Sequence, residues 1–168
     1  MSAGSLSSTP ADLPRRIAPL WAVAGVSALF AWAVWRLGWR GLLTIRGGLG
    51  GLEWAILVVL TVAFVYGEGY RALDRRWVPG LIERARALRF EHRSLVRLLA
   101  PLHGMALIAV SRGRLVRAWL GTLAIIAAIL LVRSLPEPWR GIVDFAVAAA
   151  LAWGLVAIVR RMPAVLRP

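Results

Sequence analysis

Cysteine and lysine are both absent from the 168-residue chain, and histidine occurs only twice. Without cysteine there is no disulfide, no thiolate-ligated metal and no cysteine nucleophile. Haem ligation by His92 and His103 is disfavoured, because Pro101 separates them and axial ligands come from opposite sides of the ring. The sequence therefore predicts no cofactor and no metal centre.

Acidic residues are also scarce, with 8 against 21 arginines and a net charge of +13. In a soluble protein this excess would suggest a nucleic-acid partner. Here 60% of the residues are hydrophobic, against about 45–50% in an ordinary soluble domain. The arginines flank the apolar runs, as the positive-inside bias would place them. We therefore expect a membrane protein that binds no nucleic acid.

Four apolar segments have about the length needed to cross a hydrocarbon core of ~30 Å as helices. They are Ile17 to Trp35, Leu52 to Tyr70, Leu115 to Leu135, and about Gly141 to Val159. The first could also be a cleaved signal peptide, since Ala31-Trp32-Ala33 fits the A-x-A pattern. However, its apolar run exceeds the usual ~7–15 residues and arginines follow at once. The prediction is an all-α integral membrane protein with four transmembrane helices.

These segments divide the chain into four regions. They are a disordered cytoplasmic tail at 1–16, a helical hairpin at 17–70, an arginine-rich cytoplasmic loop at 71–114, and a second hairpin with a short tail at 115–168. Within the first hairpin, the linker 36–51 is rich in glycine but lacks the GK[ST] of a phosphate loop. We interpret that linker as a flexible turn.

The arginines are distributed unequally between the two sides that four spans would create. Sixteen fall on the side of the termini and the middle loop, counting Arg117 with that loop, and five fall on the other side. The positive-inside rule then places both termini in the cytoplasm. The use of arginine without any lysine indicates codon bias in a GC-rich bacterial genome, so we expect a bacterial inner membrane.

The middle loop contains a helical pattern over residues 81–99. Its apolar stripe recurs at spacings of four and three: Leu81, Ala85, Leu88, His92, Leu95 and Leu99. Four arginines lie on another face: Arg86, Arg89, Arg93 and Arg97. The pattern predicts an amphipathic cytoplasmic helix between spans two and three. It could lie on an anionic membrane surface, or dock on the end of the bundle with its arginines in water.

Residues 98–111 are apolar but short. Pro101 interrupts the preceding pattern, and the uncharged stretch between Arg97 and Arg112 has fourteen residues. That length suits an interfacial or re-entrant segment better than a fifth span. If the segment did cross, the C-terminus would lie outside.

Three carboxylates, Glu53, Glu68 and Asp144, lie at or inside span ends. The first and the last fall near helix starts, where the helix dipole favours an anion. Glu68 lies toward the end of span two, between two glycines that let another helix come close. It is predicted either to pair with Arg71, Arg160 or Arg117, or to be the functional residue of the protein.

The fourth span carries small residues at a spacing of four, Ala146, Ala150 and Gly154. Such a face is typical of close helix packing, within the bundle or in a homo-oligomer.

The chain shows no catalytic constellation and no nucleotide loop. We therefore expect a non-enzymatic accessory or scaffold subunit that contacts anionic phospholipid or a larger membrane complex through its arginine-rich helix. An alternative is a small oligomeric permease or channel in which Glu68 has a gating or coupling role. A lipid-headgroup enzyme using His103 and an acid is a weaker third hypothesis.

Overall fold

The computed structural model describes residues 13–90, 98–107 and 111–166, and every element within these ranges is a helix. The elements are α1 (Leu13–Arg46), α2 (Gly51–Phe64), the π-helix η1 (Val65–Trp77), α3 (Val78–Ala87), the 3-10 helix η2 (Leu88–Phe90), α5 (Ala100–Gly104), α6 (Arg112–Arg133) and α7 (Trp139–Leu166). The predicted all-α class is confirmed.

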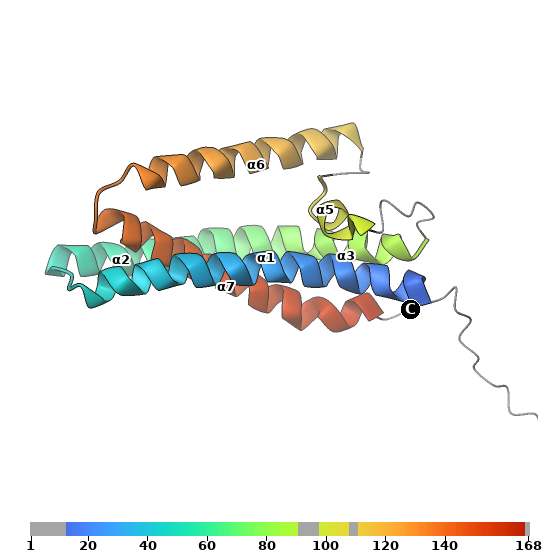
Figure 1. The fold of residues 1–168 in the computed structure, drawn as a ribbon, viewed down its shortest axis with the longest axis horizontal. Helices are drawn as coiled ribbons and strands as arrows, with labels where there is room; N and C mark the ends of the chain where they lie inside the picture. The colour runs from blue at the N-terminus through green and yellow to red at the C-terminus, as the bar shows by residue number, and fades with distance from the viewer. Residues whose placement is uncertain (1–12, 91–97, 108–110, 167–168) are drawn as a thin grey trace, which may run out of the picture.

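The long helices run side by side along one axis and alternate in direction (Figure 1). The start of α1, the end of α7, α3 and α5 lie at one end of the bundle, which we call the terminal end. The turn at Gly47–Gly50 and the connection at 134–138 lie at the opposite end, which we call the turn end. The two ends of the described chain therefore lie on the same side of the bundle.

Three helices are long and apolar enough to cross a membrane: Ile17–Arg46, Gly51–Ala87 and Trp139–Val165. Several helices of this kind are typical of a multi-pass membrane protein. The predicted third span corresponds to α6, whose apolar part, Ala118–Arg133, is shorter than the other three. The helix also ends at Arg133, two residues before the predicted limit of that span.

The first helix is longer than the apolar run that predicted it. It continues through Arg36 to Arg46, so only Gly47–Gly50 of the expected flexible linker leaves the helix. A charge ends an apolar segment but does not end a helix, because arginine is a good helix former. Gly41 is tolerated within α1 because α7 comes very close: a Cβ there would lie 2.5 Å from the Cβ of Phe145.

The second helix also continues beyond its predicted limit at Tyr70. The helix continues through Val78-Pro79-Gly80, although such a combination often stops a helix. The pitch changes from π to α at Val78, so Pro79 falls in the first turn of α3. In a first turn the missing N–H and the fixed φ of proline are tolerated.

The apolar core is concentrated toward the terminal end. It is made by small and branched residues of α1, α3, η2 and α7, among them Ala22, Val26, Leu81, Ile82, Ala85, Leu88 and Ile158. The predicted stripe is therefore buried over its first three members, Leu81, Ala85 and Leu88. Leu99 is exposed, and the stripe positions His92 and Leu95 lie outside the described residues. Over its described length, this helix is docked into the bundle.

The segment expected to be interfacial or re-entrant begins with a short helix that does not cross. The helix α5 has five residues, and its Pro101 lies against α1, where a Cβ on Gly25 would be 2.5 Å from the proline Cγ. His103 is buried in α5. The described part of 98–111 thus packs against the terminal end of α1, and 108–110 lie outside the described residues.

The small-residue face of α7 packs inside the bundle, as one of the two predicted arrangements. Ala146, Ala150 and Gly154 are all buried. A Cβ on Gly154 would lie 2.7 Å from a methyl of Leu73 and 3.3 Å from the ring of Phe30. By contrast, α6 lies to one side of the bundle and leaves apolar residues such as Leu123, Ile126 and Leu130 exposed (Figure 1).

Candidate functional site

Glu68 lies on the outward side of η1. Its side chain is exposed, whereas the next residue, Gly69, is buried. A Cβ on Gly69 would lie 3.1 Å from the Ala150 carbonyl oxygen and 3.1 Å from the Cβ of Trp153, so this glycine permits close approach of α7. A Cβ on Gly67 would meet nothing within 4 Å. Only one of the two glycines therefore serves the packing that the sequence suggested.

The ion pair with Arg160, one of the three alternatives predicted for Glu68, does not form. Arg160 instead donates a hydrogen bond to Asp74, Nη2 to Oδ2 at 3.0 Å. In the described part of the chain Glu68 also forms no ion pair with Arg71, and the side chain of Arg117 is not described. The reason is geometric, because Glu68 faces away from α7 while Asp74 faces it.

Asp74 is the buried acid of this interface, and the sequence interpretation missed it. It is 4% exposed and also pairs with Arg161 of α7. A stripe signal was present, because positions 74, 78, 81, 85 and 88 continue the spacing of four and three back from the predicted pattern. The arginines on either side of Asp74 obscured that signal.

Arg86 is the one member of the predicted arginine face whose side chain is described. Its Nε donates to the Ala164 carbonyl oxygen at 2.9 Å, so it joins α3 to the last turn of α7. The neighbouring Arg84 donates to the Gly104 carbonyl oxygen of α5 at 2.8 Å. The side chain of Arg89 is not described, and Arg93 and Arg97 lie outside the described residues.

Five exposed arginines lie on η1, α3 and α7 toward the terminal end, and we call them the terminal basic surface: Arg71, Arg75, Arg76, Arg86 and Arg160. Arg75 lies over the ring of Tyr70, 4.9 Å from its centroid. The acids of η1 and α3 are fewer: Glu68 and Glu83 are exposed, and Asp74 is neutralised by its two partners. This part of the molecule carries a surplus of positive charge.

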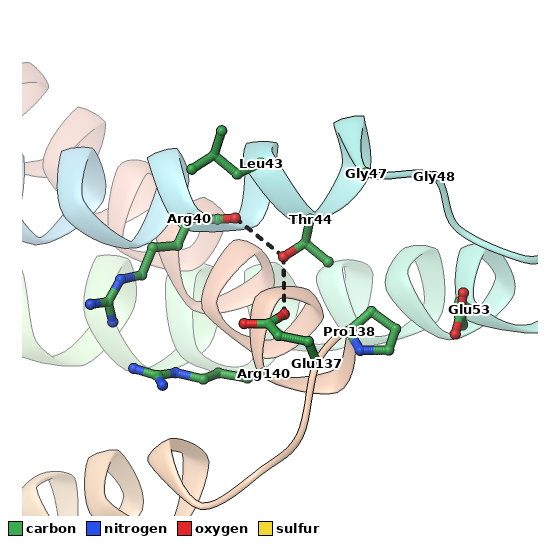
Figure 2. Close-up of a pocket in the computed structure, with 9 residues that line it drawn as sticks. All are labelled: Arg40, Leu43, Thr44, Gly47, Gly48, Glu53, Glu137, Pro138 and Arg140. Carbon is green, nitrogen blue, oxygen red and sulfur yellow. Dashed lines mark hydrogen bonds between the residues drawn. The ribbon is translucent and has the colours of Figure 1, made fainter.

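A pocket of about 670 Å³ lies at the turn end (Figure 2). It is lined by Arg40, Leu43, Thr44, Gly47, Gly48, Glu53, Glu137, Pro138 and Arg140. Gly47 and Gly48 of the turn between α1 and α2 line one part of it, and Glu137 and Pro138, which lead into α7, line another. The close approach of α1 and α7 places Arg40 and Arg140 in one pocket.

The two pocket acids each accept one hydrogen bond, Glu53 from the backbone and Glu137 from a side chain. Glu53 lies in the first turn of α2, as predicted, and its Oε2 accepts a hydrogen bond from the Gly50 N–H at 2.7 Å. Glu137 accepts a hydrogen bond from the Thr44 hydroxyl at 3.3 Å (Figure 2). In the described part of the chain Arg40 and Arg140 form no ion pair.

Asp144 lies next to this pocket, in the second turn of α7 and one turn beyond Arg140. It is 6% exposed, and its Oδ2 has no hydrogen-bond partner among the described residues. Arg140, Arg40 and Arg36 all act on it electrostatically. The structure thus brings this predicted acid together with arginines of α1 and α7.

His103 and the described acids do not form a metal site, since no group of three potential ligands occurs in the described residues. The candidate functional residues are therefore the terminal basic surface and the charged pocket at the turn end. We found no match between this chain and any protein-family model, curated protein or solved structure.

Proposed function

We propose that α1, α2 with η1, α6 and α7 form four transmembrane spans, with both termini in the cytoplasm of a bacterium. Two observations support this topology. The four segments alternate in direction between the two ends of the bundle (Figure 1). In the sequence, sixteen of the 21 arginines also belong to the two tails and the middle loop, counting Arg117, and the positive-inside rule assigns these regions to the cytoplasm. The apolar part of α6, Ala118–Arg133, would extend about 24 Å, so a crossing by α6 requires the bilayer to thin around it or its flanking arginines to reach the headgroups.

The proposed function is a non-enzymatic membrane scaffold or accessory protein that contacts anionic phospholipid through the terminal basic surface. The observation that supports this proposal is the distance of that surface from the turn end, measured along the helices. Arg71 lies twenty residues from Gly51 at the start of α2, and Arg160 lies nineteen from Gly141 near the start of α7. At about 1.5 Å per residue both lie roughly one hydrocarbon thickness, ~30 Å, from the turn end. Their guanidinium groups would reach the headgroups of the cytoplasmic leaflet.

Retention of lipid by the full-length protein tests this function. Purified protein would be offered equal amounts of phosphatidylglycerol and phosphatidylcholine with the same acyl chains, and native mass spectrometry would count the bound lipids. The wild type should retain phosphatidylglycerol preferentially. Replacing Arg71 and Arg76 with glutamine should reduce that preference by about thirtyfold, because each arginine near an anionic surface contributes ~1 kcal/mol.

The matched control removes the same charge from the turn end. Arg46→Gln with Arg133→Gln should leave the preference unchanged, because these exposed arginines lie outside the terminal basic surface. An equal loss in both double variants would mean that net charge alone attracts the lipid. If the Arg71/Arg76 variant retains lipid normally but a membrane protein that co-purifies with the wild type is lost, the surface contacts that protein instead of lipid.

The permease alternative has less support among the described residues. Glu68 is exposed and does not line the pocket at the turn end. A gating or coupling role for it would depend on a second copy of the chain.

A further inference from the structure

The side chains that line the pocket at the turn end carry charges of both signs in equal number, and the buried Asp144 beside the pocket adds a third acid. Arg40 and Arg140 contribute two cations, and Glu53 and Glu137 contribute two anions. A ligand with charge of only one sign would match only half of this lining. The matching ligand carries a negative and a positive group on the same small molecule.

The charges are also arranged in space. Arg40 and Arg140 come from different helices, yet their guanidinium groups extend in the same direction along the bundle (Figure 2). Glu53 lies at the opposite side of the pocket, and Glu137 lies between it and the arginines (Figure 2). Guanidinium groups bind phosphate oxygens with strong charge-assisted hydrogen bonds. The carboxylates provide acceptors for an ammonium group.

The glycines of α1 and α7 explain why the two arginines share this pocket. A Cβ on Gly141 would lie 1.8 Å from the Thr44 hydroxyl oxygen, so α7 touches α1 directly beside Arg140. The hydroxyl of Thr44 also contacts the Arg40 carbonyl oxygen, at 3.3 Å. The positions of both arginines are thus set by one close helix contact.

The surroundings favour a lipid as the source of this ligand. Leu43 lines the pocket and is exposed, and Trp39 and Trp54 are exposed on the neighbouring turns of α1 and α2. Exposed tryptophans near the ends of apolar helices are typical of the interface between headgroups and acyl chains. A pocket of about 670 Å³ also lies in the size range of small-ligand sites.

We propose that this pocket binds the headgroup of an ethanolamine-type phospholipid, with the phosphate between Arg40 and Arg140 and the primary ammonium group at Glu137. The ammonium of ethanolamine carries three N–H donors for the carboxylate, whereas the trimethylammonium of choline has none. The proposal does not depend on the terminal basic surface, whose Arg71 and Arg160 lie about 30 Å from the turn end.

Protection of arginines from phenylglyoxal tests the proposal on the wild-type protein. Detergent-solubilised protein would be treated with the reagent in the presence of phosphatidylethanolamine, phosphatidylcholine or phosphatidylglycerol, and peptide mass spectrometry would map the modified arginines. Phosphatidylethanolamine should slow modification of Arg40 and Arg140 at about tenfold lower concentration than phosphatidylcholine, as one charge-assisted hydrogen bond predicts. Arg133 is exposed outside the pocket and should react equally throughout.

The Glu137→Gln variant then tests the second half of the site. Glutamine can still accept the hydrogen bond from Thr44, but the carboxylate charge is lost. In the wild type phosphatidylethanolamine should protect Arg40 and Arg140 better than phosphatidylglycerol does. In this variant the order should be reversed. An unchanged order in this variant would overturn the ammonium site.

Free phosphoethanolamine separates the two possible sources of the headgroup. Protection by the lipid alone assigns the site to a membrane lipid, and equal protection by both forms assigns it to the headgroup chemistry itself. Both results support the pocket. If neither form protects Arg40 and Arg140, or if Arg133 is protected equally, the proposal is wrong. The Arg71/Arg76→Gln variant should show the wild-type pattern, so failure of the proposed function would not produce this result.

Discussion

Asp74 of η1 and Arg160 of α7 form an ion pair across the bundle, with 3.0 Å between Oδ2 and Nη2 and 86 residues between them in sequence. Arg161 pairs with the second carboxylate oxygen. Asp74 is thus the point at which the second and last long helices are joined by charge. Asp74 is buried, whereas its two arginine partners are partly exposed to solvent.

Asp74→Asn should lower the stability of the protein. The substitution removes the charge that compensates two arginines, although their side chains are 57% and 37% exposed and can be hydrated in part. Loss of a fully buried partner costs about 3–5 kcal/mol, so a partly exposed pair should cost about 1–3 kcal/mol. Thermal unfolding in detergent would measure the difference.

Glu68→Gln is the matched control for this prediction. Glu68 is an exposed acid on the same π-helix, so its neutralisation should change stability by no more than about 0.5 kcal/mol. An effect as large as that of Asp74→Asn would show that Glu68 has a stabilising partner outside the described residues. If both variants are as stable as the wild type, the Asp74 ion pair does not stabilise the protein.

The contrast between Glu68 and Asp74 shows how far sequence reasoning reaches. Composition and apolar run length predicted an all-helical membrane protein, because both depend on the chain alone. Whether Glu68 or Asp74 is the buried acid depends on which side of η1 faces α7. The close packing of Gly69 against α7 decides that side. Asp74 has the same helical spacing as the stripe of Leu81, Ala85 and Leu88, so the sequence could have placed it on the buried face. The sequence did not indicate its ion pair.

The pocket at the turn end was predictable only in part. The position of Glu53 near a helix start was correct, because the dipole argument is local. The presence of Arg40 and Arg140 in one pocket was not predictable, since it requires α1 to continue beyond its apolar run and to touch α7 at Gly141. Contacts between distant segments of this kind leave no periodic pattern in the sequence.

Gly141→Ala should destabilise the protein by about 1–3 kcal/mol. A Cβ at this position would lie 1.8 Å from the Thr44 hydroxyl oxygen and 2.5 Å from the Thr44 Cβ, so α1 and α7 would have to separate. Overpacking of a close contact has a cost of this size. The control is Gly121→Ala in α6, where a Cβ meets nothing within 4 Å and alanine favours the helix. Melting temperatures should fall for the first variant and stay equal or rise for the second.

Arg86→Gln should destabilise the docking of α3 on the last turn of α7. Its guanidinium holds the Ala164 carbonyl oxygen, and loss of such a bond costs on the order of 1 kcal/mol. Arg76→Gln removes an equal charge from an exposed position and should leave stability unchanged. Limited proteolysis at the C-terminus would detect the loosened end. Equal cleavage of both variants would mean that the contact with Ala164 contributes nothing.

The topology prediction concerns α6, the least packed of the long helices. If α6 crosses the membrane, alkaline phosphatase should be active when fused after Arg46 or Pro138, and inactive after Phe90, Ser111 or Pro168. The reason is that the turn end would lie outside and the terminal end in the cytoplasm. Fusions to a fluorescent protein that matures only in the cytoplasm should give the opposite pattern at each position.

The fusions after Ser111 and Pro138 distinguish the two ways in which this topology could be wrong. If α6 lies along the surface instead of crossing, phosphatase should be inactive after both residues and active after Pro168. If residues 98–111 cross, phosphatase should be active after Ser111, inactive after Pro138 and active after Pro168. The described part of that segment makes the second outcome unexpected, because α5 has only five residues and packs against α1 at Gly25. Activity after Pro138 together with inactivity after Ser111 can arise only if α6 itself spans the membrane.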